Sequence, residues 1–278
     1  MTEDDLRALI EAYPVEGDPP ALREAFERLA AAAGAPDLSG LAVTAGTDGD
    51  APYTVFQPEG AEGAPIVHLH GGGYVFGSVT SHAAMAACLA RAARRPLVLL
   101  GYPLAPEAPW PAQRDAVMAF LAAIGPPFVL SGDSAGGHLA LSCALSGAKA
   151  EALLLFSPNA SRAYGRSATR GEPTDAMNDH GTDDRLGRMA FGRTLASDPD
   201  QTVLDRDLSG LPRTFLDVGT EEVLRGECSA LSRKLARDGV PHALRMRSGF
   251  HMIQLFAAAY EPGRRSLEAA GRWLAAEA

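Results

Sequence analysis

The sequence predicts an α/β fold built on a mostly parallel sheet with helices on both faces. Strand-like and helix-like segments alternate through most of the 278 residues, which is the order of βαβ units. The segments PIVHLH, PLVLLGY, FVLSG and ALLLFS are also nearly continuous in apolar residues. Such runs are expected for strands that are buried on both faces of a sheet.

Eight strands are expected from the apolar and β-branched runs. They lie near residues 41–45, 53–57, 65–70, 96–101, 127–131, 152–156, 213–218 and 242–247. Helical patterns between and after them lie near residues 81–94, 112–124, 135–147, 223–238 and 252–276. No helix separates the first two or three strands, which is compatible with antiparallel pairing there.

Two helices are expected before the first strand, at residues 2–12 and 19–34. Thr2 is the expected N-cap of the first, because acidic residues follow it in the first turn. Between residues 157 and 212 the alternation gives way to polar, Gly- and Asp-rich sequence with one helical pattern near 183–196. An insertion of this length is more typical of a lid over a site than of a linker.

Composition excludes several classes of function. A formal net charge of −9 with scattered arginines argues against binding to nucleic acid or to anionic lipid surfaces, which need clustered Lys and Arg. No apolar run reaches membrane-spanning length. We therefore expect a protein without nucleic-acid partners and without stable membrane association.

The cysteines and the amino terminus favour a cytoplasmic location. Cys88, Cys143 and Cys228 are far apart and odd in number, so they form neither a closed disulfide framework nor a metal-ligand spacing. The first residues, MTEDDLRALIEAYP, are acidic and amphipathic, whereas a secretory signal is basic and then continuously apolar. No metal is expected.

The stretch VLSGDSAGG at residues 129–137 places Ser134 where a buried strand gives way to a helix. Glycines two residues before and after it, Gly132 and Gly136, relieve crowding in a tight strand-to-helix turn that leaves the hydroxyl pointing outward. The pattern G-x-S-x-G is compatible with an ordinary glycine turn as well as with a nucleophile. Other parts of the chain must decide between these interpretations.

A second glycine-rich turn, HLHGGG at residues 68–73, follows an earlier apolar strand. Three consecutive glycines free the backbone to aim its N–H groups at a developing negative oxygen. Carboxyl ends of neighbouring parallel strands share one edge of a sheet, so this loop and Ser134 are expected to lie side by side. The two motifs together favour a nucleophile with an oxyanion hole.

Three ordered motifs, HGGGYVFGS, GYPLAPEAPWPA and SGDSAGGHLAL, resemble the bacterial hormone-sensitive-lipase-like group of the α/β-hydrolase family. The resemblance extends from about Pro65 to His251. It implies the α/β-hydrolase fold, with a mostly parallel eight-stranded sheet, a small helical cap and hydrolysis of esters. The implied division is cap helices at 1–40, a cap insertion at 158–211, and a core at 41–157 and 212–278.

Residue by residue, the resemblance places the nucleophile at Ser134 and the oxyanion donors in the glycine loop and after the serine. Those donors are Gly71, Gly72, Gly73 and Ala135, with Gly72 and Ala135 expected to contribute most. In the family Asp133 helps to shape the turn at the nucleophile, and it is a candidate pocket residue here. No cofactor is implied.

The general base is expected at His251. A serine hydroxyl is a weak nucleophile near neutral pH and needs a base held in one tautomer, and His251 follows the last strand in a short loop, where the family places that base. His70 shapes the glycine loop in the family, and His68 is expected to be a hydrogen-bonded core residue. His138 departs from the family pattern, and packing and lining of the pocket both stay open for it. No neighbour suggests chemistry for His82, His180 and His242.

The acid is expected at Glu222. The segment TEEVLRGE resembles the acid segment of the family, and alignment on its Leu-Arg pair places Glu222 at the acid position. Glu221 and Asp217 remain rivals, and a strand carboxylate such as Asp217 needs a partner to be buried at all. The chain order Ser134, Glu222, His251 is the order that the fold requires.

The expected function is hydrolysis of small-molecule esters with short acyl chains, because the cap is small. Tyr74, which follows the glycine loop with Val75 and Phe76, is a candidate residue of the acyl-pocket wall, as is His138. Two alternatives stay open: an amidase or formamidase, since GGHLAL also resembles kynurenine formamidases, and a non-catalytic small-molecule receptor. The resemblance also suggests a homodimer paired through residues 242–247.

Overall fold

The computed structural model describes residues 1–49, 51–161, 174–192 and 201–276. Its centre is an eight-stranded sheet in the order β1-β2-β4-β3-β5-β6-β7-β8. The strands are β1 Leu41–Asp48, β2 Ala51–Pro58, β3 Ile66–Leu69, β4 Leu97–Leu100, β5 Phe128–Asp133, β6 Ala150–Phe156, β7 Arg213–Gly219 and β8 His242–Arg247. The predicted eight-stranded α/β fold is thereby confirmed.

The sheet is antiparallel at one side and parallel elsewhere. β1 pairs with β2, and β2 with β4, in antiparallel register. From β4 through β3, β5, β6 and β7 to β8, every pairing is parallel. All the carboxyl ends of the parallel strands therefore meet at one edge of the sheet, which is where ligands bind in folds of this kind.

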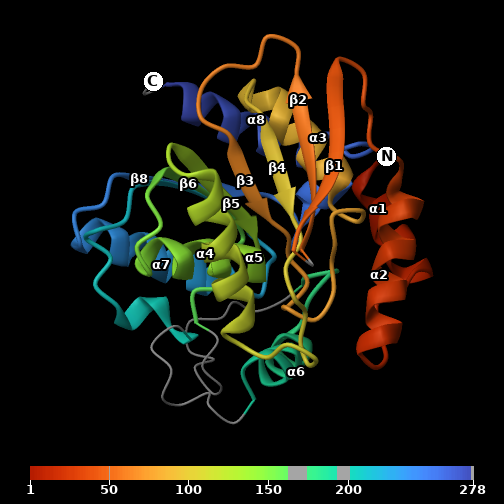
Figure 1. Cartoon of the computed structure of the whole chain (residues 1–278). Coiled ribbons are helices and arrows are strands. Elements are labelled where there is room, and N and C mark those ends of the chain that lie inside the picture. The colour runs from red at the N-terminus through yellow and green to blue at the C-terminus, as the bar shows by residue number, and fades with distance from the viewer. Residues whose placement is uncertain (50, 162–173, 193–200, 277–278) are drawn as a thin grey trace.

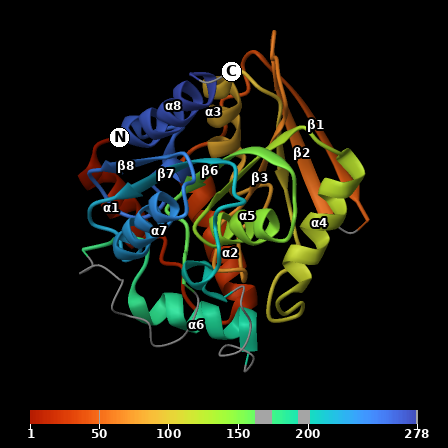
Figure 2. The same ribbon diagram turned by 90° about the vertical axis from the view of Figure 1, so that its left-hand side faces the viewer.

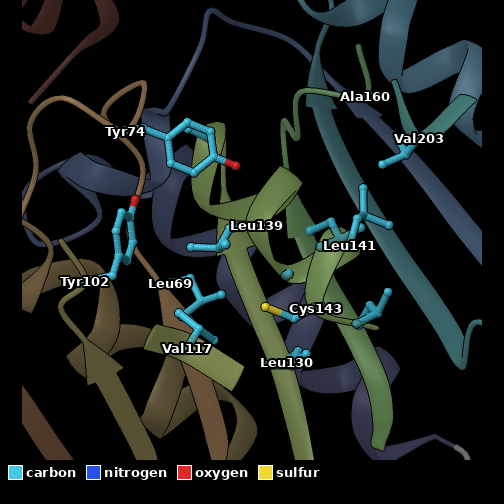
Figure 3. Close-up of a cluster of buried hydrophobic side chains, with 14 of the residues drawn as sticks. Leu69, Tyr74, Tyr102, Val117, Leu130, Leu139, Leu141, Cys143, Ala160 and Val203 are labelled. Carbon is cyan, nitrogen blue, oxygen red and sulfur yellow. The ribbon is translucent and has the colours of Figure 1, made fainter. Parts of the chain in front are cut away.

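Helices cover both faces of the sheet (Figures 1 and 2). One face carries α3 Ala83–Ala93 and α8 Glu261–Ala275, and the other carries α4 Ala112–Ile124, α5 Ala135–Leu145 and α7 Arg225–Arg237. The central strands are buried on both faces, as the continuous apolar runs predict. Figure 3 shows part of the larger core, where Leu130 of β5 lies among side chains of α5 such as Leu139 and Cys143.

The remaining helices lie beyond the carboxyl edge of the sheet or beside it. They are α1 Glu3–Ala12, α2 Pro19–Ala33, α6 His180–Phe191 and the short 3-10 helices η4 Val203–Asp205 and η5 Ile253–Phe256. Thr2 caps α1 through a capping box with Asp5, as the sequence predicts. Leu6 and Phe26 of α1 and α2 pack against Phe250 and Phe256, so the amino-terminal helices are fixed to the loop that follows β8.

Two predicted helices differ from the structure. The segment predicted as one helix at 252–276 consists of two helices, η5 at Ile253–Phe256 and α8, which begins only at Glu261. Gly263 packs there so closely against the backbone of Ile253 that a Cβ would lie 2.2 Å from the carbonyl oxygen of Ile253. α6 begins three residues earlier than predicted, and residues 193–196 of the predicted helix lie outside the described residues, as do 162–173 of the insertion. No helix within the described ranges is long and apolar enough to cross a bilayer.

Candidate active site

Ser134 stands at the turn between β5 and α5. Its backbone adopts φ 51° and ψ −119°, a strained conformation for a residue with a side chain. The turn demands glycine on both sides, since a Cβ at Gly132 would lie 2.3 Å from the Gly136 oxygen and a Cβ at Gly136 would lie 2.0 Å from the Leu69 oxygen. The crowding inferred from the sequence is present, and it fixes the position of the serine at the edge of the sheet.

The glycine loop after β3 lies beside this turn. Gly72 and Gly73 have φ values of +109° and +62°, in the region that favours glycine. The part of the chain that the structure describes offers no hydrogen-bond acceptor to the N–H groups of Gly72, Gly73 and Ala135. Gly72 and Gly73 also line the cavity next to Ser134, whereas Ala135, the residue after the serine, is buried.

Gly71 differs from its neighbours in the loop. Its N–H donates to Nε2 of His82 at 3.3 Å, and Gly71 is not among the residues that line the cavity next to Ser134. The prediction that Gly71 is an oxyanion donor is therefore wrong, because its donor is already occupied. His82, for which the sequence suggested no chemistry, instead supports the loop from behind.

His251 and Glu222 come together from two different loops. Nδ1 of His251 lies 3.0 Å from Oε2 of Glu222, and both side chains are buried. Oε1 of Glu222 accepts hydrogen bonds from the Gly219 N–H at 2.7 Å, the Ser157 hydroxyl at 2.7 Å and the Arg247 guanidinium at 2.8 Å. Every oxygen of this buried carboxylate is therefore satisfied, and it faces the histidine in a fixed orientation.

The charges around this pair set its protonation. Burial by itself raises the pKa of Glu222, but Arg247 and His251 outweigh it and hold the pKa below its usual value. Burial lowers the pKa of His251, yet its hydrogen bond to Glu222 and the charges of Glu222, Asp175 and Asp133 outweigh that effect and raise the pKa. With Glu222 ionised, Nδ1 of neutral His251 is assigned the proton, and Nε2 is left unprotonated.

The two rival acids lie elsewhere. Asp217 is fully buried on β7 and is held by Arg245 at 2.5 Å, by Arg247 at 2.8 Å and by Gln254 at 2.9 Å. Glu221 lies 2.6 Å from Arg7 on α1. Neither carboxylate contacts a ring nitrogen of His251 in the described residues. The partners that a buried Asp217 requires are thus Arg245, Arg247 and Gln254.

Ser134 and His251 line one cavity of about 470 Å³. Gly72 and Gly73 form its wall at the oxyanion loop. Apolar side chains of α1, α2 and the segments beyond them line much of the rest, and they include Ile10, Leu22, Phe26, Phe76, Leu186 and Met252. Five acidic residues also line it, namely Glu11, Glu16, Asp175, Asp179 and Asp183. Ser134 and His251 therefore share a partly open, mainly apolar space of ligand size.

Three residues predicted to line the substrate pocket do not line this cavity. Tyr74, Asp133 and His138 are fully buried. The Tyr74 hydroxyl lies 2.6 Å from Nδ1 of His138, and Figure 3 shows Tyr74 within the hydrophobic core next to α5. The prediction is corrected for both, because the core needs their ring surfaces and each satisfies the polar atom of the other.

Asp133 is an interior support of the turn and the glycine loop. Its Oδ1 lies 3.0 Å from Nε2 of His68, and its Oδ2 lies 3.5 Å from Nε2 of His82. Burial by itself raises the pKa of Asp133, but His82 and His68 outweigh it and hold the pKa well below the usual range. His70 stacks on Tyr102 with ring centres 4.2 Å apart, and burial, assisted by His82, lowers its pKa to about 3. The core role predicted for His68 is confirmed.

Asp175 is a residue of the cavity that the sequence did not single out. It belongs to the insertion, and its Oδ1 accepts a hydrogen bond from the backbone N–H of His251 at 3.1 Å. No motif surrounds it, because the segment around it, GEPTDAMND, is simply polar and rich in acidic residues. The local signal was only the aspartate itself, since Asp side chains often accept from the backbone N–H two residues on, as Asp175 does from Met177.

Comparisons with known proteins identify relatives across most of the chain. The family model described as alpha/beta hydrolase fold matches residues 66–255. An acetyl-hydrolase of Streptomyces hygroscopicus is 32% identical over 231 residues, which are 78% of this chain and 77% of that protein. An esterase of Acinetobacter venetianus is 27% identical over 73% of this chain and 71% of that protein. A crystal structure of an esterase from the bacterial hormone-sensitive lipase family superposes with a TM-score of 0.87 at 26% identity, and the alignment covers 99% of this chain and 98% of that one.

Proposed function

Because the chain belongs to the alpha/beta hydrolase family and is similar to bacterial esterases of the hormone-sensitive lipase group, we propose that it is a serine carboxylesterase. The observation that carries this proposal is the shared cavity. Ser134 at its strained turn and His251, oriented by Glu222 at 3.0 Å, both line it. A nucleophile, an oriented base and a buried acid are the three parts that acyl transfer requires.

Nε2 of His251 takes the proton of Ser134 as the serine oxygen bonds to the ester carbonyl carbon. The imidazolium that forms is stabilised by the carboxylate of Glu222. His251 then gives this proton to the departing alcohol as the carbon–oxygen bond of the ester breaks. Water, deprotonated by the same histidine, releases the acid from Ser134 and restores the resting enzyme.

The negative oxygen of each tetrahedral intermediate is received by the N–H groups of Gly72, Gly73 and Ala135. The positive φ values of the two glycines turn their backbone into the cavity. Gly72 is irreplaceable here, because a Cβ would lie 2.2 Å from the Phe76 oxygen. Loss of one such donor typically costs about 10²–10³ in rate.

Substrates with short acyl chains are favoured. The 32% identity to a protein named acetyl-hydrolase supports this choice, and a cavity of about 470 Å³ lies in the lower half of the range for small-molecule sites, about 300–1,000 Å³. A substrate of a few carbons in its acid leaves room for an alcohol group against the apolar wall.

Turnover of p-nitrophenyl acetate against N-formylkynurenine tests the proposal. We expect hydrolysis of the ester with a much larger kcat/KM. Preferred hydrolysis of N-formylkynurenine would indicate a formamidase instead. No turnover of either compound, combined with tight binding of a small molecule, would indicate a receptor.

A further inference from the structure

The carboxylate of Asp175 joins three segments of the chain at the candidate active site. Besides the His251 N–H, it accepts hydrogen bonds from the Val223 N–H at 3.2 Å and from the Met177 N–H at 3.0 Å. Val223 directly follows Glu222. One side chain of the insertion thus holds the loop that carries the acid and the loop that carries the base.

Arg7 of α1 contacts the same three segments as Asp175, on the side nearer to the surface of the protein. Its guanidinium lies 2.6 Å from Oε2 of Glu221, 3.5 Å from the Thr174 carbonyl oxygen, and 4.9 Å from the ring centre of Phe250. The three contacted residues directly precede Glu222, Asp175 and His251 in the sequence. The same three segments are therefore held together by two residues, the buried carboxylate of Asp175 and the more exposed guanidinium of Arg7.

Asp175 also acts on the charge of the base. Burial raises the pKa of the Asp175 carboxyl, while the nearby His251 opposes this rise. The other acidic groups near His251 are Glu222 at the end of β7 and Asp133 at the end of β5. Asp179 and Asp183 lie across the cavity, and Arg247 lies beyond Glu222. Among these, Asp175 and Glu222 are the two carboxylates that hydrogen bond to His251.

We propose that Asp175 is a positioning residue of the hydrolytic reaction, which keeps the Glu222 and His251 loops in register and stabilises the imidazolium that forms when His251 accepts the serine proton. Arg7 supports the same loops from the surface. This inference rests on the proposed function and extends it, because it assigns a role to the insertion and to α1 beyond covering the cavity.

Asp175→Asn is the informative variant. An amide of the same shape can still accept from the His251 N–H, but it has lost the charge, and its second group is a donor that faces the Val223 N–H. Because the folded state raises the Asp175 pKa, loss of the charge does not itself destabilise the fold at neutral pH. The donor that meets the Val223 N–H costs stability, so thermal melting of the variant accompanies the kinetics, and activity is measured well below its melting temperature. We expect kcat to fall about 10- to 100-fold, as for a lost hydrogen bond to a charged group, with KM changed by less than about threefold.

The pH profile separates positioning from a merely structural role. The acid limb of kcat/KM reports protonation of the base in the free enzyme. Since the charge of Asp175 raises the His251 pKa, its removal should move that limb to lower pH. Asp207→Asn is the matched control: Asp207 accepts from the N–H two residues ahead, Ser209, just as Asp175 does from Met177, but it lies outside the cavity lining.

Arg7→Gln tests the outer contacts. We expect kcat to fall about three- to tenfold, and the double variant with Asp175→Asn to lose less than the product of the two single losses, because both act on the same loops. Arg28→Gln is the matched control, since Arg28 forms an i,i+4 pair with Glu24 on α2 as Arg7 does with Glu3 on α1.

Two outcomes separate this inference from the proposed function. A wild-type protein that neither hydrolyses p-nitrophenyl acetate nor reacts with a fluorophosphonate contradicts the proposed function itself. An active wild type whose Asp175→Asn variant keeps the acid limb at its original pH overturns the role of Asp175, whether or not kcat falls. A limb that moves to lower pH, with the Asp207→Asn profile unchanged, supports it.

Discussion

Glu222→Gln is expected to separate the fold of this protein from its chemistry. The amide has the shape of the carboxylate but must choose between two orientations. If its oxygen faces Nδ1 of His251, its NH₂ group meets three donors, from Gly219, Ser157 and Arg247. If its NH₂ group faces Nδ1, the histidine is held in the tautomer whose Nε2 carries the proton.

In either orientation of the amide, His251 no longer works as an efficient base. In the first orientation, the three buried donors repel the NH₂ group and disturb the geometry that His251 needs. In the second orientation, Nε2 cannot take the proton of Ser134. Loss of a tautomer-fixing acid lowers kcat by roughly 10²–10⁴ in other triads, which corresponds to about 2.7–5.4 kcal/mol of transition-state stabilisation. We expect a value in this range for Glu222→Gln.

The assay is hydrolysis of p-nitrophenyl acetate with thermal melting of each variant in parallel. Glu221→Gln is the adjacent control; Glu221 faces Arg7 instead of His251, and its variant should stay within about tenfold of the wild type. The reasoning is refuted if Glu222→Gln is nearly fully active while Asp217→Asn, still folded, is inactive. Asp217 would then be the acid.

Four further outcomes follow from the structure. Gly72→Ala should lower kcat about 10²–10³-fold, because its Cβ would collide with the Phe76 backbone, whereas Gly60→Ala, also at positive φ but with open space around it, should keep its activity; equal activity of the two variants would contradict the role of the loop. Asp217→Ala should destabilise the fold by about 3–5 kcal/mol in urea unfolding, since it leaves Arg247 buried without that partner; a change below about 1 kcal/mol would contradict this account. In a chain-length series of p-nitrophenyl esters, kcat/KM should peak for acids of two to six carbons, and a higher value for twelve carbons than for four would overturn the short-chain preference. Sedimentation should show a dimer paired through β8, an edge strand on which Met246 is 50% exposed; a monomer at roughly tens of micromolar would refute it.

The sheet could be predicted from sequence because its signal is local. β5 is buried throughout and β6 over its last five residues, and they contain the apolar runs FVL and ALLLF that indicated the two strands. The turn at Ser134 could also be predicted from sequence, since glycine is the only residue that fits at Gly132 and Gly136. Where the backbone is this crowded, only glycine fits, so the crowding can be recognised from the sequence.

The cavity lining could not be predicted in the same way. Tyr74 follows the glycine loop and reads as a pocket residue, yet its ring turns into the core, where the His138 side chain meets its hydroxyl. Asp175 reads as one acid among many, and its contacts with His251 and Val223 depend on how the insertion folds back. Contacts between segments far apart in the chain leave no periodic pattern.

The central claim is that Ser134 is a nucleophile activated by His251. Mass spectrometry after reaction with a fluorophosphonate tests it most directly, because the reagent bonds only to an activated serine and the modified peptide identifies the residue. We expect one label, on Ser134, in the wild type and none in Ser134→Ala. Labelling of the alanine variant at the wild-type rate, or of a different serine in the wild type, would contradict the account.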